Sequence, residues 1–183
     1  MSQDPETLFD QLLAEQRERR LPPVDQWQPE REARIDMRIA RDGTWYHEGE
    51  PIRREAMVRL FSTILRREGE RFCLVTPAEK LELEVEDAPF LAVGLERSGE
   101  GETQRLLFTT NVGEHVLVDA EHPLEVGEMD GEPAPYVLVR DGLWARITRS
   151  AFYRLVDLAE PAPGDPRSLI VRSAGESFEL GRI

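Results

Sequence analysis

The chain has 183 residues, of which 40% are hydrophobic and 32% charged, and it carries a formal net charge of −13. These values are typical of a folded protein with one large or two small domains, and they exclude a disordered chain. The negative charge disfavours binding to DNA or RNA, because it repels their phosphates. No membrane span is expected, because the longest mainly apolar stretch, Phe90 to Leu95, is far too short.

The sequence predicts a cytoplasmic protein. The chain starts without a basic head or an apolar run, which argues against a secretory signal. Cys73 is the only cysteine, so no internal disulfide can form, and its apolar neighbours are typical of a buried strand.

Residues 1–21 are predicted to form an N-terminal amphipathic helix. Asp4 has the position of an N-cap, and Pro5 follows at the first helical position. The apolar stripe of this helix consists of Leu8, Phe9, Leu12 and Leu13. Such a stripe must pack on the rest of the chain or on a partner, and the sequence leaves both open.

A first unit, within residues 22–87, is predicted to contain a β-hairpin, a helix and two further strands. Alternating apolar residues over 35–40 predict a strand, and Asp42-Gly43 predicts a two-residue hairpin turn. A helix is expected from about Arg53 to Glu68, followed by strands over 71–75 and 80–86. The apolar face that this helix should turn to the core consists of Met57, Leu60, Phe61 and Ile64.

A second domain, residues 88–183, is predicted to open with additional strands and to continue with a unit like the first. Strands are expected over 90–96, 104–110 and 115–118, before an acidic loop over 125–135. A hairpin turning at Asp141-Gly142 then leads to a helix capped by Thr148, a loop over 160–166 and two strands near 168–172 and 177–180. The apolar face of the helix consists of Phe152, Leu155, Val156 and Ala159.

An internal repeat connects the two units. The segment 41–45 returns as 140–144, positions within 52–60 match 147–155, and positions within 79–83 match 176–180. Three blocks in the same order indicate a duplicated unit with changes in loop length. We therefore expect an α+β fold with duplicated strand–strand–helix–strand–strand units forming two packed domains, and a cleft between them.

No catalytic signature is present: the sequence lacks a phosphate-binding loop, a dinucleotide fingerprint, a nucleophile elbow and paired cysteines. The three histidines are isolated, so we expect neither a metal nor a cofactor. Lys80 is the only lysine among 23 basic residues, which hints at a site that requires a compact ammonium group, although chance explains it equally well.

The best remaining candidates for a site are basic, hydroxyl and aromatic residues near the repeated turns. Arginine and lysine can hold a phosphate, threonine and asparagine can donate hydrogen bonds, and tyrosine or tryptophan can stack on a base. The candidate ligand-binding residues are Arg140, Arg146, Arg149, Lys80, Thr76, Glu79, Asn111, Tyr136 and Trp144. For each residue taken alone, pairing with the many carboxylates or packing in the core is the favoured interpretation.

Several blocks of the sequence resemble a known family. They are the segments over 35–46, 57–61, 76–80, 85–90, 122–124 and 135–140. Together they are similar to the bacterial domain-of-unknown-function 1285 family. The resemblance implies a duplicated α+β body whose C-terminal domain superficially resembles pleckstrin-homology folds. It also implies a ligand site between the domains, suited to a nucleotide-type molecule, and a part in signal transduction, but no assigned activity or catalytic residue.

Three functions fit these observations. The first is a non-enzymatic module that binds a nucleotide-like anion at the interface between the repeat domains and acts in signalling. The second is a protein–protein interaction adaptor that uses the pleckstrin-like half or the N-terminal helix. The third is an enzyme that processes a nucleotide or phosphoester with Glu79, Asp87 or His122 as acid–base groups. The ligand, the partners and the oligomeric state are left open.

Overall fold

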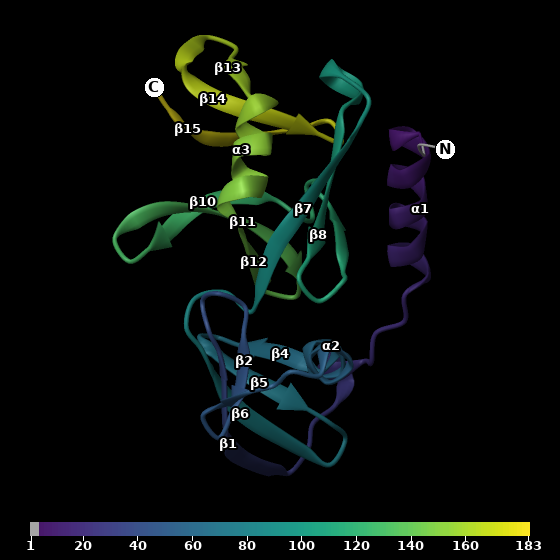
Figure 1. The fold of residues 1–183 in the computed structure, drawn as a ribbon, viewed down its shortest axis with the longest axis vertical. Coiled ribbons are helices and arrows are strands. Elements are labelled where there is room, and N and C mark those ends of the chain that lie inside the picture. The colour runs from purple at the N-terminus through teal and green to yellow at the C-terminus, as the bar shows by residue number, and fades with distance from the viewer. Residues whose placement is uncertain (1–3) are drawn as a thin grey trace.

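Two stacked β-sheet domains form the body of the protein in the computed structural model, which describes residues 4–183 (Figure 1). Each domain is built on a six-stranded sheet, and the second also carries a three-stranded sheet. The class is α+β, as the sequence predicts. Residues 1–3 of the predicted N-terminal segment lie outside the described part. Within residues 4–183, no helix combines the length and the apolar composition that a bilayer crossing needs.

The first domain contains one helix and a mixed sheet, after a short 3-10 helix (Val24–Gln26). Its sheet has the order β3-β2-β1-β6-β5-β4, in which β1 and β6 run parallel and the other neighbouring pairs run antiparallel. The elements are β1 (Arg31–Ile39), β2 (Trp45–His47), β3 (Glu50–Pro51), α2 (Glu55–Thr63), β4 (Leu65–Glu68), β5 (Arg71–Val75) and β6 (Glu79–Val85).

The second domain holds a sheet with the order β10-β11-β12-β7-β8-β9 and a smaller sheet, β13-β14-β15. A 3-10 turn (Gly101–Thr103) follows β7. The other elements are β7 (Phe90–Ser98), β8 (Arg105–Thr110), β9 (His115–Leu117), β10 (Leu124–Met129), β11 (Glu132–Arg140), β12 (Leu143–Ile147), α3 (Arg149–Asp157), β13 (Glu160–Ala162), β14 (Asp165–Ser173) and β15 (Glu176–Arg182).

The two units share an element order but differ in strand pairing. The run β1-β2, α2, β4-β5-β6 is matched by β11-β12, α3, β13-β14-β15. In the first unit β6 pairs with β1, whereas in the second β10 takes that side of β11, and β15 lies in the separate sheet. In the second domain β10 therefore takes the place that β6 has in the first, and β7 takes the place of the two-residue strand β3. The likeness of the second domain to pleckstrin-homology folds stays a prediction.

Several predicted element boundaries are wrong. The first helix ends at Thr63, not at Glu68, because Leu65–Glu68 pairs with β5 as a strand and Gly69 turns between them at a φ of +63°. The predicted loops over 125–135 and 160–166 contain the β10–β11 hairpin and strand β13, respectively. In each case hydrogen bonds to a distant or neighbouring strand decide the structure, and local propensity does not.

The two repeated Asp-Gly turns also differ. Asp141 and Gly142 both have positive φ and connect paired Arg140 and Leu143, as expected of a two-residue hairpin turn. The first copy forms a longer turn, in which the amide of Ala40 donates to the carbonyl of Thr44. The prediction of a two-residue turn is therefore confirmed only in the second copy.

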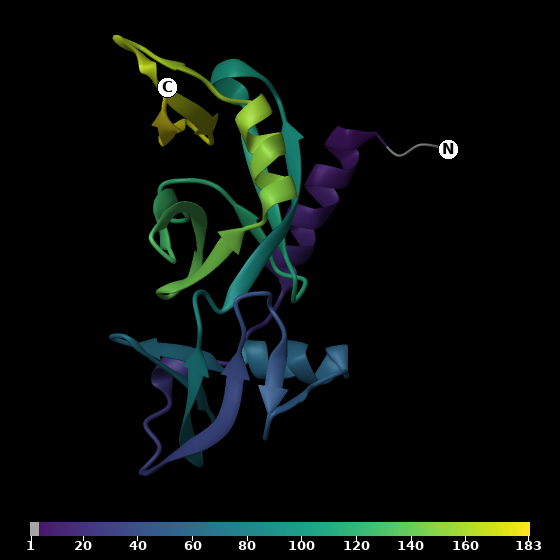
Figure 2. The same cartoon turned by 60° about the vertical axis from the view of Figure 1, so that its left-hand side comes forward.

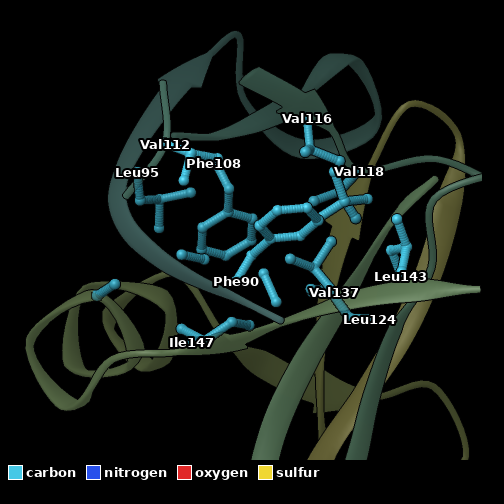
Figure 3. Packing of buried hydrophobic residues seen from close by; sticks show 14 of the residues in the cluster. Phe90, Leu95, Phe108, Val112, Val116, Val118, Leu124, Val137, Leu143 and Ile147 are labelled. Atoms are coloured by element: carbon cyan, nitrogen blue, oxygen red, sulfur yellow. The ribbon is translucent and has the colours of Figure 1, made fainter. Parts of the chain in front are cut away.

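The hydrophobic core is continuous across both domains (Figure 3 shows its part around Phe90 and Phe108). In the first domain Trp45 is buried and stacks on Phe61, so this tryptophan serves the core. Cys73 is also buried, and burial raises the pKa of its thiol, because a thiolate is poorly solvated there. The thiol is therefore held in its unreactive form, as the sequence indicates.

Helix α1 (Pro5–Glu18) packs on the second domain, which resolves whether its apolar stripe needs a partner. The Asp4 side chain caps it with Pro5 at its start, as predicted. Phe9 and Leu13 lie against Leu107 of β8, and the Glu6 carboxylate accepts hydrogen bonds from Ser98 Oγ (2.5 Å) and the Gly99 amide (3.1 Å). Strand β7 thus lies between α1 and α3 (Figure 2).

Candidate functional site

Beside the shared hydrophobic core, polar contacts cross the boundary between the domains, from the β1–β2 turn, α2 and β4 to the β11–β12 hairpin. Arg146 Nη2 donates to the Arg41 carbonyl (2.7 Å), and the Arg41 side chain pairs with Asp130. Arg67 Nη1 reaches the Gly142 carbonyl at 3.0 Å. Backbone carbonyls and carboxylates of the protein therefore already bind these arginines.

Asp87 lies at the end of the first domain, between Tyr136 and Arg146. The Tyr136 hydroxyl donates to Asp87 Oδ1 (2.8 Å), and Arg146 Nε lies 3.4 Å from Asp87 Oδ2. Burial, and then the negative Asp87, raise the pKa of Tyr136, so this phenol stays protonated at physiological pH. Tyr136 is thus a hydrogen-bond donor within the protein in this structure.

Arg140 is held by a buried carboxylate. Its Nη2 donates to Glu114 Oε1 (2.9 Å) and to the Ser62 carbonyl at the end of α2 (2.8 Å). Its Nε lies 3.3 and 3.2 Å from the two Glu114 oxygens, and the guanidinium faces the Phe90 ring. This candidate residue connects the domains, and it does not line the cavity described below.

Thr76, Glu79 and Lys80 lie at the start of β6, whose other end leads into the second domain. Lys80 Nζ binds Glu32 (2.8 Å) and both oxygens of Glu68 (3.0 and 2.9 Å), which belong to β1 and β4. The Thr76 hydroxyl accepts from the Glu79 amide, and Glu79 pairs with Arg31. These three candidates are therefore grouped with each other but not with the arginines of the second domain.

Two further candidates of the second domain are Asn111, in the turn after β8, and Trp144, in β12. Asn111 Oδ1 accepts from the Leu91 amide (3.0 Å), which ties the β8–β9 turn to β7. Trp144 is half-buried in β12, opposite Leu138 of β11. Neither residue lines the cavity described next.

A cavity of about 310 Å³ lies in the second domain, with walls from the β10–β11 hairpin, β12, β15 and the first turns of α3. We call it the α3 cavity. Its lining is mainly apolar and aromatic, with one carboxylate and two of the predicted arginines, Arg146 and Arg149. The lining residues are Val126, Met129, Glu132, Pro133, Ala134, Pro135, Arg146, Ile147, Arg149, Phe152, Tyr153 and Leu180.

Sequence reasoning missed most of this lining for a physical reason. Residues 126–135 read as a polar acidic loop, whereas they fold into a hairpin whose Met129 and two prolines line the same cavity as the start of α3. One signal was available in the sequence: Phe152 and Tyr153 are adjacent on the predicted helix. Adjacent helix positions cannot both face the core, so one of these aromatic rings must lie outside it.

The groups considered for acid–base catalysis do not meet in the structure. Asp87 contacts Tyr136 and Arg146, Glu79 pairs with Arg31, and His122 Nδ1 lies 2.9 Å from Asp119. Among residues 4–183, no cluster of three histidine, cysteine, aspartate or glutamate side chains is placed to hold a metal ion. The geometry of the described residues thus gives the enzyme hypothesis no assembled site.

Comparison with family models shows the protein family to which the chain belongs. Residues 22–88 match the N-terminal domain of the domain-of-unknown-function (DUF1285) family, and residues 89–180 match its C-terminal domain. The chain belongs to the DUF1285 family.

Two solved structures of the same family are similar to this one. A DUF1285 family protein from Silicibacter pomeroyi DSS-3 is 48% identical, with a TM-score of 0.84 over 94% of this chain and 95% of that one. A second, from Shewanella baltica OS155, is 28% identical, with a TM-score of 0.53 over 66% of this chain and 90% of that one. A search among curated proteins gives no match.

Proposed function

We propose that this protein is a non-enzymatic binding module for a small anionic ligand of nucleotide type, held in the α3 cavity beside the domain boundary, with a role in signalling. The observation that carries the proposal is that one cavity combines an arginine free of carboxylates with aromatic and apolar side chains. Such a lining suits a ligand with a charged group and a flat, largely apolar body.

Arg149 supplies the cation that such a ligand would meet. It is exposed in the first turn of α3, and no carboxylate within residues 4–183 forms an ion pair with it. A guanidinium binds a phosphate or carboxylate through two parallel hydrogen bonds, and the positive end of the α3 dipole adds to the attraction. The anionic group is therefore assigned to the α3 end of the cavity.

The remaining walls favour a flat ligand body over a bare inorganic ion. Phe152 and Tyr153 offer aromatic rings, and Met129 and the prolines of the hairpin extend the apolar surface. Glu132 can accept a hydrogen bond from an N–H or O–H group, which a base or a sugar carries. The cavity volume, about 310 Å³, lies at the lower end of the range for small-molecule sites, so a mononucleotide is a better match than a dinucleotide.

Arg146 offers a route from ligand occupancy to the domain contact. It lines the cavity and also donates to the Arg41 carbonyl of the first domain, beside Asp87. A ligand anion that binds Arg146 competes for its guanidinium with the Arg41 carbonyl and Asp87. The ligand therefore binds more tightly when Arg146 turns into the cavity than when it contacts the first domain. This coupling is the basis for the signalling part of the proposal.

The test is a thermal-shift screen of the full chain against nucleoside monophosphates, nucleoside diphosphates and cyclic dinucleotides, with EDTA present. A ligand at a hundredfold excess over its Kd stabilises the folded state by about 2.7 kcal/mol, which gives a clear rise in Tm. Hits are then titrated by calorimetry on the wild type, Arg149→Ala and Arg154→Ala.

Arg154 is the matched control, because it is an exposed arginine of the same helix that does not line the cavity. We expect Arg149→Ala to weaken binding about tenfold or more, as for loss of one charge-assisted contact, and Arg154→Ala to leave it unchanged. Equal losses in both variants, or a flat screen across all three ligand classes, would contradict the proposal.

A further inference from the structure

Helix α2 presents an apolar face that no described part of the chain covers. Its inner side carries Phe61 and the buried Ser62, whereas Ala56, Met57 and Leu60 are exposed on the other side. Leu60 is 61% exposed, and these three residues border a shallow hollow with Arg54 and Glu55. The prediction that Met57 and Leu60 face the core is therefore wrong.

The second copy of the repeat shows that the same sequence positions normally pack against protein. Leu60 corresponds to Leu155, which is fully buried, and Ala56 corresponds to Ala151, which is 2% exposed. Strand β7 runs along α3 and contributes to this burial (Figure 2). In the first domain only the two-residue strand β3 follows β2 in the sheet, so no long strand covers α2.

Three arginines in α2 or directly before it have no carboxylate partner within residues 4–183. Arg53, Arg54 and Arg59 are exposed, and none of them forms an ion pair with a carboxylate of residues 4–183. The contrast with β1 of the same domain is clear, because each of its arginines has a carboxylate partner. These pairs are Arg31–Glu79, Arg34–Glu82 and Arg38–Glu86.

Unpaired cations beside exposed apolar side chains are unexpected in a chain with 36 acidic residues. A partner that covers Met57 and Leu60 would bury this apolar area and gain charge complementarity if it carried carboxylates around its own apolar residues. The nine residues of α2 extend about 13 Å, enough to contact two turns of a helix or a short extended segment.

We propose that the exposed face of α2, formed by Ala56, Met57, Leu60 and the flanking Arg53, Arg54 and Arg59, is the docking surface for an acidic amphipathic segment of a partner protein. The apolar residues provide the contact area, and the arginines select partners rich in aspartate and glutamate. This surface belongs to the first domain and is independent of the α3 cavity.

The test is a selection from a displayed library of random peptides on the immobilised full chain, followed by affinity measurements with the enriched peptides. The variants are Leu60→Glu, which places a charge in the apolar patch, and the double variant Arg53→Glu/Arg54→Glu, which reverses the flanking charge. The matched controls on α3 are Val156→Glu and Arg154→Glu, at positions that are also exposed. Because all of these side chains are exposed, the variants should unfold at the wild-type temperature, which a thermal melt checks.

We expect enriched peptides that combine aspartate or glutamate with large apolar residues. Both α2 variants should weaken their binding about tenfold or more, as for loss of an interface anchor, and both controls should leave it unchanged. An empty selection, enrichment of non-acidic peptides, or equal binding to the α2 variants would overturn the proposal. So would a wild-type dimer in sedimentation velocity that Leu60→Glu dissociates, or binding to vesicles with anionic lipids that this variant abolishes, because the occupant would then be a second copy or a membrane.

Discussion

The guanidinium of Arg140 and the carboxylate of Glu114 form an ion pair in the interior of the protein, with Glu114 only 1% exposed and the closest contact at 2.9 Å. The same guanidinium donates to the Ser62 carbonyl across the domain boundary. The pair therefore joins the β11–β12 hairpin, the β8–β9 turn and the end of α2. Arg140, in the second copy of the Arg-Asp-Gly sequence, is thus a structural anchor. Arg41, in the first copy, forms its ion pair at the surface.

Removing one partner of this pair should destabilise the fold strongly. Glu114→Gln and Arg140→Met each leave a buried group without its counter-charge, so we expect a loss of about 3–5 kcal/mol in urea denaturation. The double variant Glu114→Gln/Arg140→Met should lose less than the sum of the two. As a control, Arg97→Met breaks an exposed pair with Glu100 and should cost less than about 1 kcal/mol. Additive losses in the double variant would show that the two residues do not act as a pair.

Gly43 should tolerate a side chain less well than Gly49. Both have positive φ, +88° and +82°, so alanine is strained by about 1–2 kcal/mol at either position. A Cβ at Gly43 would also lie 2.8 Å from Asn111 Nδ2 and 3.0 Å from Leu91 Cδ1, both in the second domain, whereas nothing lies within 4 Å at Gly49. We expect Gly43→Ala to lose about 1 kcal/mol or more beyond Gly49→Ala in urea denaturation. Equal losses in the two variants would show that Asn111 and Leu91 move away from the added Cβ at little cost in stability.

Stability at acidic pH should depend on Glu68. Hydrogen bonds from Lys80 are the main cause that lowers the pKa of this carboxyl below its usual 4.5. A lowered native pKa means that the stabilisation is complete above the ordinary pKa and is lost as the pH falls through the native one. Glu68→Gln should therefore flatten the dependence of Tm on pH below about pH 4.5.

The matched control for this titration is Glu70→Gln, an exposed glutamate of the same hairpin without an ion pair in the described structure. It should retain the wild-type slope of Tm against pH. At the alkaline end the sign reverses, because contacts with Glu32 and then Glu68 raise the pKa of Lys80 above 10.5. The stabilisation from Lys80 is complete below that value and is lost as the pH rises through the native pKa.

Helix α1 should depend on Phe9 for its contact with the second domain. Phe9 is fully buried against Leu107, so Phe9→Ala is expected to cost about 3–5 kcal/mol or to release the helix if its docking energy is smaller. Amide hydrogen exchange over Pro5–Glu18 and the neighbouring β8 should accelerate. Thr7→Ala, at an exposed position of the same turn, should change neither. Unchanged exchange in the Phe9 variant would show that other contacts hold the helix.

Local chemistry alone determined several parts of this protein. The Asp4 cap with Pro5, the Thr148 cap of α3 and the two-residue turn at Asp141-Gly142 follow from side-chain hydrogen bonds and backbone preferences within a few residues, and all are confirmed. Short runs of apolar residues likewise predict β5 and β8 in the right places, because consecutive side chains on both faces of these strands are buried.

Only the tertiary structure decided the rest, because it depends on which distant segments meet. Strand β4 replaces the last helical turn of the prediction once it can pair with β5. Leu60 and Leu155 occupy the same repeat position, but β7 runs along α3 and no long strand runs along α2, so one is exposed and the other buried. The predicted arginines separate for the same reason: Arg140 meets the buried Glu114, whereas Arg149 meets the hairpin that completes the α3 cavity.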